Sequence, residues 1–534
     1  MMEEKGYLLI VLNTHMPFVH SPEVGYSSEE TWLFEAMTEC YIPLIRVFQK
    51  LYADGIDFRI TQSLTPCLLS MLANIEVQDR YLQYLDDHIR LAESETTRLQ
   101  AQPRLRRLAY AYVEHYTQLR EYFVQHWRKN LLTAFKALND SGKVALLTSG
   151  ATHAYFPLWE LYPQMVDVQI QIGVQQYRQA FDRNPLGFWL PECAFYPGVD
   201  RLLRKSGLRY FFLDSHGLLN GHPRPKYGVY APIHCPSNVA AFGRDWESHD
   251  LVWLKDKGYP GDPHYLDHDR DIGYELPEDY LFPFTHCEHR IPTGIKYHRL
   301  GAVWGSDVYE PEAAIARCDA HTDHFVHRCQ EQVERLYQQL GKKPVIVALF
   351  DTEHFGHWWH EGPTWLDLAI RKLACDQNTV KLVTGADYLT MYPTNQVVMP
   401  SMSSWGYQGY NETWLMGRNH WIYPQLYAAV EDFEHLLSLF PSPQADIRLA
   451  LNQYLRELLL AQSSDWAFIL HQETAQDYAA GRVKAHIENM TRIYQQVRQQ
   501  TPDKQWLIAL QKGTPLFPEM DLLTYYRQSE SVNA

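Results

Sequence analysis

Short apolar runs, separated by segments with helical periodicity, organise most of this 534-residue chain. Each run holds about four to six mostly apolar residues, which is the pattern of strands buried on both faces of a sheet. The runs that predict strands are Tyr7–Leu12, Phe58–Thr61, Lys143–Thr148, Gly187–Leu190, Tyr210–Leu213, Val345–Phe350 and Val380–Val383. Helical patterns such as residues 30–53 and 200–205 lie between them. This alternation predicts a parallel α/β barrel or an open parallel sheet.

Three regions depart from the alternation. Residues 72–140 show helical spacing of apolar residues and no strand pattern, so we interpret them as a helical insertion, with ordinary long barrel helices as the alternative. Residues 232–300 are rich in Gly, Pro, His and Asp, and a segment this long with little periodicity is usually a lid or a binding loop. After residue 401 the pattern is helical again, which predicts a helical C-terminal domain.

The charge balance limits the partners of the protein. Its 48 Lys and Arg against 63 Asp and Glu give a net charge of −15, whereas nucleic acids and anionic membranes reward a basic surface. Eight scattered cysteines form no C-x-x-C pair, which favours reduced thiols in a cytosol. No basic leader precedes the short first apolar run, so we expect a cytoplasmic protein that acts on a neutral substrate without a membrane.

Two carboxylates stand where apolar runs end. Glu192 follows Trp189-Leu190-Pro191, and Asp351 directly follows Val345–Phe350. Burying an acid beside an apolar strand is costly, and catalytic groups of barrels lie at the carboxyl ends of strands. Cleavage of a glycosidic bond needs one proton donor and one nucleophile or base, with flat faces for the sugar rings. The bland alternatives are a surface loop glutamate and an aspartate that caps a helix.

Histidines suggest a rival chemistry. His354, His357 and His360 lie close together near Asp351 and Glu353, while His15 and His153 follow other apolar runs. Histidines and acids at strand ends can hold a metal ion, so a metal-dependent deacetylase is an alternative. The H-x-x-H spacing is not the H-E-x-x-H pattern of metalloproteases, and a structural hydrogen bond is the commonest role for any one histidine.

Residues 403–414 form a Gly-punctuated loop with two Trp and two Tyr. Such a loop hints at a platform for a ligand with flat apolar faces, and a plug between two domains is the alternative. Asp465, after a leucine-rich helical pattern, is either a hydroxyl-binding acid or a helix cap.

Taken together, these stretches resemble glycoside hydrolase family 57, and in particular its 1,4-α-glucan branching enzymes. The likeness runs over nearly the whole chain. The matching stretches are Asn13–Phe18, Ala151–His153, Trp189–Ala194, Gly258–Pro263, Arg270–Gly273, Thr293–Tyr297, Asp351–Glu353, Phe355–Trp359, Ser403–Gly406 and Ser463–Trp466.

The resemblance implies an α/β fold with a seven-stranded parallel (β/α) barrel. Residues 1–71 and 141–395 would form the catalytic barrel, with a lid at about 232–300. Residues 72–140 would be the helical insertion, and residues 396–534 an α-helical domain that closes the cleft. It also implies an enzyme without a metal or cofactor that acts on an α-1,4-glucan and makes α-1,6 branches in glycogen or starch synthesis by a retaining mechanism. We further expect a monomer.

The resemblance also assigns residues. Glu192 matches the nucleophile and Asp351 the general acid/base of the family. The positions that match substrate-binding or cleft residues are Arg270, Trp405, Asp465, His15, His153, Trp253 and Trp414.

Three residues depart from the family pattern. Asn13 stands where many members have histidine, Ala154 where glycine is usual, and His354 where leucine is usual. These differences bear on the balance between transfer and hydrolysis. An α-glucan hydrolase and a 4-α-glucanotransferase are therefore the alternatives within the family, and a glucan-binding protein with little activity is the one outside catalysis.

Overall fold

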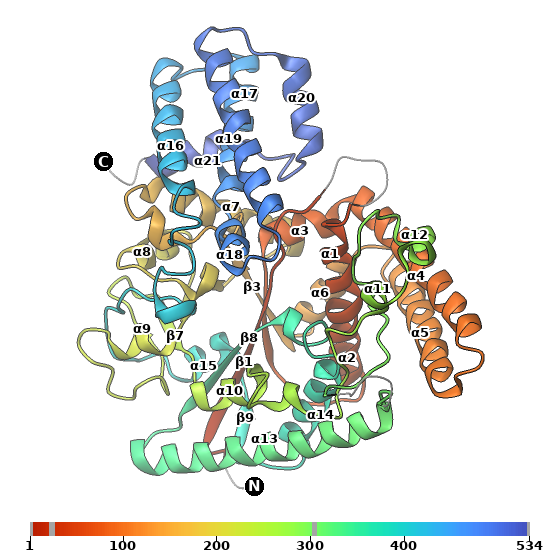
Figure 1. The fold of residues 1–534 in the computed structure, drawn as a ribbon. Coiled ribbons are helices and arrows are strands. Elements are labelled where there is room, and N and C mark those ends of the chain that lie inside the picture. Colours follow the sequence, from red (N-terminus) through yellow and green to blue (C-terminus); the bar gives the residue numbers. More distant parts are fainter. Residues whose placement is uncertain (1–3, 21–26, 302–306, 531–534) are drawn as a thin grey trace.

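The computed structural model describes residues 4–20, 27–301 and 307–530. A curled sheet lies at its centre, with helices around it, and the C-terminal helices stand above the sheet (Figure 1). The long helix α13 (Pro311–Leu340) crosses below the sheet in the same view.

Seven parallel strands form the body of the sheet, in the order β8-β1-β2-β3-β4-β5-β7. Their bounds are β1 (Gly6–Thr14), β2 (Ile60–Leu64), β3 (Val144–Ser149), β4 (Gly187–Trp189), β5 (Tyr210–Leu213), β7 (Ala240–Gly243) and β8 (Val345–Asp351). Just after β7, the Asp245 amide donates to the carbonyl of Val347 on β8 at 2.8 Å, which links the two ends of the series. The predicted seven-stranded parallel barrel is thereby confirmed.

Two further strands accompany the seven. β6 (Ile233–His234) pairs antiparallel with β7, and β9 (Val380–Leu382) pairs with the start of β1. All seven ranges predicted from apolar runs contain or overlap a strand. The prediction missed β6 and β7, which lie inside the segment expected to be an irregular lid. Ala240–Gly243 was not predicted as a strand because two alanines and a glycine give only a weak strand signal.

Burial explains why β1 and β8 read as continuous apolar runs. Every residue of β1 is buried, and so are the first six of β8, because helices cover the outer face of the sheet and the barrel interior is filled. The parallel register places Asn13 of β1 opposite Asp351 of β8 and, on the other side, opposite Ser63 of β2. Polar residues at the end of an apolar strand therefore meet at one rim.

The segment between β2 and β3 is helical. Its helices are α3 (Pro66–Ala73), α4 (Ile75–Arg98), α5 (Pro103–Glu121) and α6 (Leu131–Asp140). The helical character predicted for residues 72–140 is therefore present, and α4 and α5 stand side by side at one flank of the barrel (Figure 1).

The C-terminal part is helical from α16 onward. Its helices are α16 (Ile422–Leu439), α17 (Ala445–Ala461), α18 (Ser464–Gln472), α19 (Gln476–Arg498), α20 (Lys504–Gly513) and α21 (Leu522–Glu530). The residue before α18, Ser463, pairs with Ala154 in the loop after β3, so the start of this helix lies at the barrel. None of the helices in the described ranges is long and apolar enough to cross a lipid bilayer.

Candidate active site

The two predicted acids come from strands on opposite sides of the barrel, and both lie at the rim formed by the carboxyl ends of the strands. Glu192 lies in a 3-10 turn, Pro191–Cys193, directly after β4, and Asp351 is the last residue of β8. Glu192 adopts a positive φ of 61°, as does His153 after β3 with 57°. Residues other than glycine rarely adopt this conformation, and such strain concentrates at functional sites.

Both carboxylate oxygens of Glu192 accept hydrogen bonds. The indole N–H of Trp405 donates to Oε2 at 2.8 Å, and the Ser464 hydroxyl donates to Oε1 at 2.7 Å. The side chain is only 13% exposed. Two donors on a buried carboxyl favour its ionised form and fix its direction, which suits a nucleophile.

Asp351 is held from one side only. Asn13 Nδ2 donates to Oδ1 at 2.9 Å, and Ser63 in turn donates to Oδ1 of Asn13 at 2.7 Å. No hydrogen bond within the described ranges reaches Oδ2 of Asp351, so this oxygen can carry a proton. A carboxyl with one fixed and one available oxygen suits a general acid/base.

The pair retains protons near neutral pH. Burial raises the pKa of Glu192 to about 7, against the opposing effect of the Trp405 and Ser464 hydrogen bonds, and the charge of Asp351 adds to the rise. Burial likewise raises the pKa of Asp351 to about 6. Between these pKa values the two carboxyls hold about one proton, which is the state that a reaction with one acid and one carboxylate requires. The order of the two values does not assign the roles, whereas the hydrogen-bond donors on Glu192 do.

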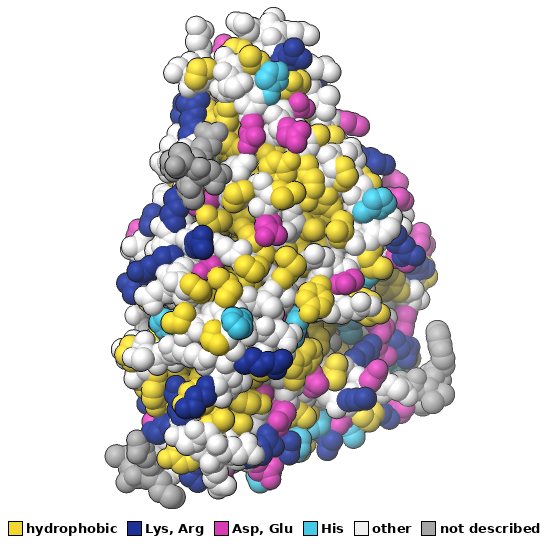
Figure 2. Space-filling model, turned by 90° about the vertical axis from the view of Figure 1, so that its left-hand side faces the viewer, with side chains coloured by type: hydrophobic (Ala, Val, Ile, Leu, Met, Phe, Trp, Pro, Cys, Tyr) yellow, Lys and Arg dark blue, Asp and Glu magenta, His cyan; other side chains and the backbone are white. Residues whose placement is uncertain are grey.

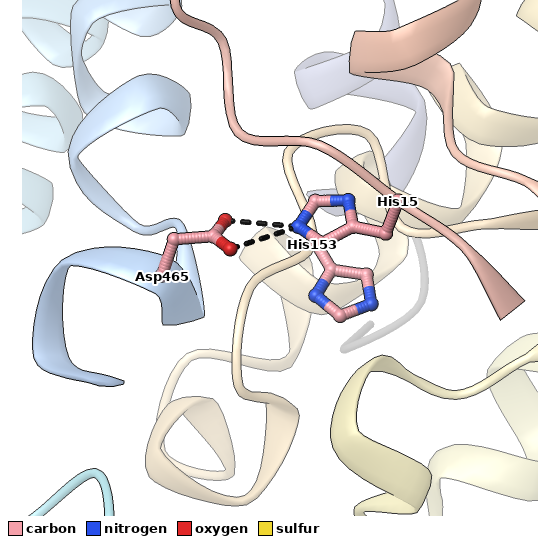
Figure 3. A group of neighbouring side chains, drawn as sticks. All are labelled: His15, His153 and Asp465. Atoms are coloured by element: carbon pink, nitrogen blue, oxygen red, sulfur yellow. Dashed lines mark hydrogen bonds and ion pairs between the residues drawn. The ribbon is translucent and has the colours of Figure 1, made fainter. Parts of the chain in front are cut away.

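A second cluster joins three predicted residues, His15, His153 and Asp465 (Figure 3). His15 Nε2 donates to both oxygens of Asp465 at 3.0 Å, and the two imidazoles stack with centroids 3.8 Å apart. Burial lowers the pKa of His15, but the charge and hydrogen bond of Asp465, together with the charges of Glu192 and Glu353, outweigh it and the net pKa is raised. Burial and the His15 charge together lower the pKa of His153, which is therefore neutral.

The neutral His153 connects this cluster to Glu192. Ser464 donates its hydroxyl proton to Glu192, so its oxygen accepts from the Nδ1–H of His153 at 3.1 Å. The backbone amide of Ser464 also donates to the His153 carbonyl at 3.0 Å. A residue of the C-terminal helices thus sets the orientation of the predicted nucleophile.

The same three side chains are the one group within the described ranges whose ligand atoms lie close enough to suggest a metal ion, all within 4.8 Å of one another. Their arrangement does not fit one. An imidazole binds a metal in its own ring plane, and the planes of His15 and His153 are within 16° of parallel, so no point near both nitrogens lies in both planes. The Asp465 oxygens already accept from His15.

The histidines that suggested a metal site from the sequence do not converge. His354 Nε2 donates to the carbonyl of Val252 at 2.7 Å, and His357 Nδ1 donates to Glu39 at 2.5 Å. His360 lines a cavity together with Glu39 and Tyr309, and neither Asp351 nor Glu353 is among its lining residues. The close spacing of these residues misled because a short 3-10 turn and a loop point them in different directions.

The aromatic loop holds one predicted ligand residue at the site and one beneath it. Trp405 touches Glu192 and packs edge-to-face on Trp189 at 5.2 Å. Trp414 is 1% exposed and stacks on Tyr155 at 4.2 Å. A Cβ on Gly406 would come within 2.6 Å of the Trp414 ring. Trp414 therefore supports the loop from below and presents no face to a ligand in this structure.

The two remaining predicted residues lie in or beside the lid. Trp253 ends α10 (Trp246–Trp253) and stacks on His354 at 5.0 Å, next to the turn that follows Asp351. Arg270 precedes α11 (Ile272–Glu275), and its Nε donates to Glu275 at 2.8 Å. Trp253 is thus tied to the turn after Asp351, whereas this hydrogen bond of Arg270 stays within the segment expected to be a lid.

The sequence did not predict one polar pair, Tyr41 and Glu353. Tyr41, in a π-helical turn at Met37–Tyr41, donates its hydroxyl to Oε1 of Glu353 at 2.6 Å. Burial raises the pKa of Glu353 to about 8, and the charge of Asp351 adds to the rise, so Glu353 is protonated at neutral pH. A π-helical turn is a frequent mark of functional sites, but no sequence signal for it was available.

The barrel, with two buried acids on its rim and indoles beside them, defines an enzyme of the glycoside hydrolase type. The profile described as glycosyl hydrolase family 57 matches residues 9–282, and a profile described as the 1,4-alpha-glucan branching enzyme C-terminal region matches residues 425–525. The chain belongs to glycosyl hydrolase family 57.

Individual relatives agree with this assignment. The chain is 30% identical to the 1,4-alpha-glucan branching enzyme TK1436 of Thermococcus kodakarensis, covering 92% of this chain and 73% of the relative. It is similar to the crystal structure of a branching enzyme of this family from Pyrococcus horikoshii, with 30% identity, a TM-score of 0.87 and coverage of 98% and 97%. It is also similar to the alpha-amylase AmyC of Thermotoga maritima, with 38% identity, a TM-score of 0.90 and coverage of 98% and 99%.

Proposed function

We propose that this protein is a 1,4-α-glucan branching enzyme that works by a retaining double displacement. One observation carries the proposal: Ser464, from the helical segment that matches the branching-enzyme C-terminal profile, donates a hydrogen bond to Glu192. The segment that matches the branching-enzyme C-terminal profile therefore contributes a side chain directly to the proposed reaction centre.

In the first step, Glu192 attacks the anomeric carbon of an α-1,4-linked glucose unit. Asp351 gives its proton to the leaving 4-oxygen, the glycosidic bond breaks, and a glycosyl ester forms on Glu192. Trp405 and Ser464 hold the Glu192 oxygens in place for this attack.

In the second step, Asp351 takes a proton from the 6-hydroxyl of an acceptor glucan. That oxygen attacks the anomeric carbon, the ester bond breaks, and an α-1,6 branch is formed while Glu192 returns as a carboxylate. The two steps balance in atoms and protons without a metal or cofactor. The product class places the enzyme in the synthesis of a branched glucan such as glycogen or starch.

Hydrolysis is the second candidate, because water can replace the acceptor hydroxyl in the same step. The similarity to the amylase AmyC supports hydrolysis. The chain is similar to a branching enzyme to nearly the same degree, so overall structural similarity does not separate the two activities. The C-terminal match favours branching. A 4-α-glucanotransferase differs only in using an acceptor 4-hydroxyl.

Linkage counting on amylose tests the proposal. The purified protein is incubated with amylose, α-1,6 linkages are counted by proton NMR, and new reducing ends are counted in the same samples. Branching predicts new α-1,6 linkages in large excess over net reducing ends. Reducing ends without α-1,6 linkages would assign a hydrolase, and unchanged linkage numbers with altered chain lengths would assign a 4-α-glucanotransferase.

A further inference from the structure

Trp246 is a large aromatic side chain that the reaction described above does not use. It comes three residues after β7, at the same rim of the barrel as the two acids, and it is 47% exposed. An exposed indole that is already held in one orientation loses little conformational freedom when a ligand packs on it, so Trp246 is a candidate ligand contact.

Buried polar residues fix the Trp246 ring. Its N–H donates to the hydroxyl of Ser215, and the Arg244 guanidinium lies 4.2 Å from the ring centroid. Arg244 is itself paired with Asp214, and both are almost fully buried, at 4% and 2% exposure. One face of the indole is therefore covered by a cation that cannot move away, and the exposed surface is left to the other face and edge.

The neighbouring histidine extends the same surface. His216 follows Ser215 in α9 (Ser215–Leu219), and its Nε2 donates to the carbonyl of Gly409 at 2.7 Å. The ring of Tyr410, which is 42% exposed, meets the edge of His216 with centroids 5.5 Å apart. Gly409 has φ of +83°, and a Cβ there would come within 2.7 Å of His216, so the turn fits this histidine closely.

Hydrogen bonds link these residues to Glu192. Ser404 donates its amide to the same Gly409 carbonyl at 2.8 Å, and Trp405, the next residue, donates to Glu192. Tyr155 donates its hydroxyl to the Tyr410 carbonyl at 3.0 Å, which holds the loop from below. The contacts thus run from Glu192 through the aromatic loop and His216 to Ser215 and Trp246.

We propose that Trp246, His216 and Tyr410 form a platform on the barrel rim that binds a stretch of α-1,4-glucan chain beyond the glucose unit at the two acids. A pyranose ring has a C–H face that packs on an aromatic ring, whose negative face attracts the polarised C–H groups, while its hydroxyls bond to groups such as imidazole. Arg244 and Asp214 neutralise each other beneath the ring, and the chain carries a net charge of −15, so a neutral ligand suits this surface better than an anion.

Figure 2 views the side of the molecule on which α9 lies in Figure 1 and shows hydrophobic side chains over its middle, mixed with histidine and with both basic and acidic side chains. The identity of the platform's ligand rests on the proposed function. The platform adds a binding surface that makes affinity depend on the length of the glucan chain. It predicts that affinity for malto-oligosaccharides grows with length because extra rings reach the platform.

Calorimetric titration of the full chain carrying Glu192→Gln, which binds without turnover, tests the platform. Maltotriose, maltoheptaose and a longer linear malto-oligosaccharide are the probes. We expect Trp246→Ala in this background to weaken binding of the longest probe about three- to tenfold and to remove most of the gain from maltotriose to that probe. Tyr410→Ala is expected to act in the same direction, and Trp246→Phe to keep most of the gain.

Trp506 provides the matched control, because it is another indole with an arginine, Arg492, stacked 3.8 Å from its centroid, but on α20. Trp506→Ala should leave the length dependence intact. An unchanged length dependence in folded Trp246→Ala and Tyr410→Ala proteins would overturn the platform. So would a change of oligomeric state in Trp246→Ala without loss of glucan affinity, since that would assign the surface to a protein contact.

The two proposals fail in different ways. Absence of α-1,6 linkages in the active enzyme, with length-dependent binding still lost in Trp246→Ala, rejects branching and keeps the platform. Normal branching with unchanged binding in Trp246→Ala rejects the platform alone.

Discussion

Asn13 donates a hydrogen bond to Asp351 at 2.9 Å across two adjacent parallel strands. The register of β1 and β8 places the two residues opposite each other, and Ser63 holds the Asn13 oxygen from the third strand. The proposed acid/base is thus positioned by backbone register, and its partner is one of the three residues expected to depart from the family pattern.

Replacing Asn13 should move the pH profile. The Asn13 hydrogen bond lowers the pKa of Asp351 against the effect of burial, so Asn13→Leu should raise that pKa above about 6. We expect the optimum of the kcat/KM profile to shift to higher pH and kcat to fall about tenfold. Asn13→His, which restores a donor, should retain more activity. An unshifted optimum in Asn13→Leu would contradict the role given to Asn13.

Ser464→Ala removes one of the two donors on Glu192. The Ser464 bond opposes the effect of burial, so its loss should raise the pKa of Glu192 above about 7 and leave less of the carboxylate at neutral pH. The optimum of the kcat/KM profile should move to higher pH, with kcat reduced about tenfold. Ser438→Ala is the control, since Ser438 only bonds a carbonyl on the exposed side of α16. Equal profiles for the two variants would argue against this role of Ser464.

Glu192 should destabilise the folded protein once it is ionised. Its pKa is raised in the folded state, so the folded protein holds this proton more tightly than the unfolded chain between about pH 4.5 and 7. Stability from this group is present below about pH 4.5 and is lost as the pH rises through 7. Glu192→Gln should therefore gain stability over the wild type at pH 8, by roughly 1–3 kcal/mol, and much less at pH 4.5. Urea unfolding at both pH values measures the difference, and a larger gain at the lower pH would contradict the sign.

The Tyr41–Glu353 hydrogen bond should contribute to stability. Tyr41→Phe leaves the buried Oε1 of Glu353 without its donor, which costs about 1–3 kcal/mol. Because Glu353 is protonated near neutral pH, Glu353→Leu removes the acceptor without removing a charge, and the double variant should lose less than the sum of the two single losses. Chemical denaturation of the four proteins checks this, and additive losses would show that the two side chains are not coupled.

The sequence predicted the parallel barrel because its strands, buried on both faces, appear as unbroken apolar runs. It predicted the two acids because each closes such a run. It missed β7, whose small residues resemble a loop, and it could not show that Ser464 meets Glu192, since 272 positions separate them. Neighbouring histidines in a motif also misled, because local turns and not spacing decide where His354 and His357 point.

The roles of Glu192 and Asp351 are tested most directly by trapping the glycosyl-enzyme. An α-maltosyl fluoride needs no protonation of its leaving group, so Asp351→Ala should form the ester at Glu192 and then resolve it slowly. Mass spectrometry of the quenched and digested protein should find the glycosyl mass on the peptide that contains Glu192, and no such adduct when Glu192→Gln is added. A glycosyl adduct on a different residue, or the same adduct in the double variant, would contradict the double displacement.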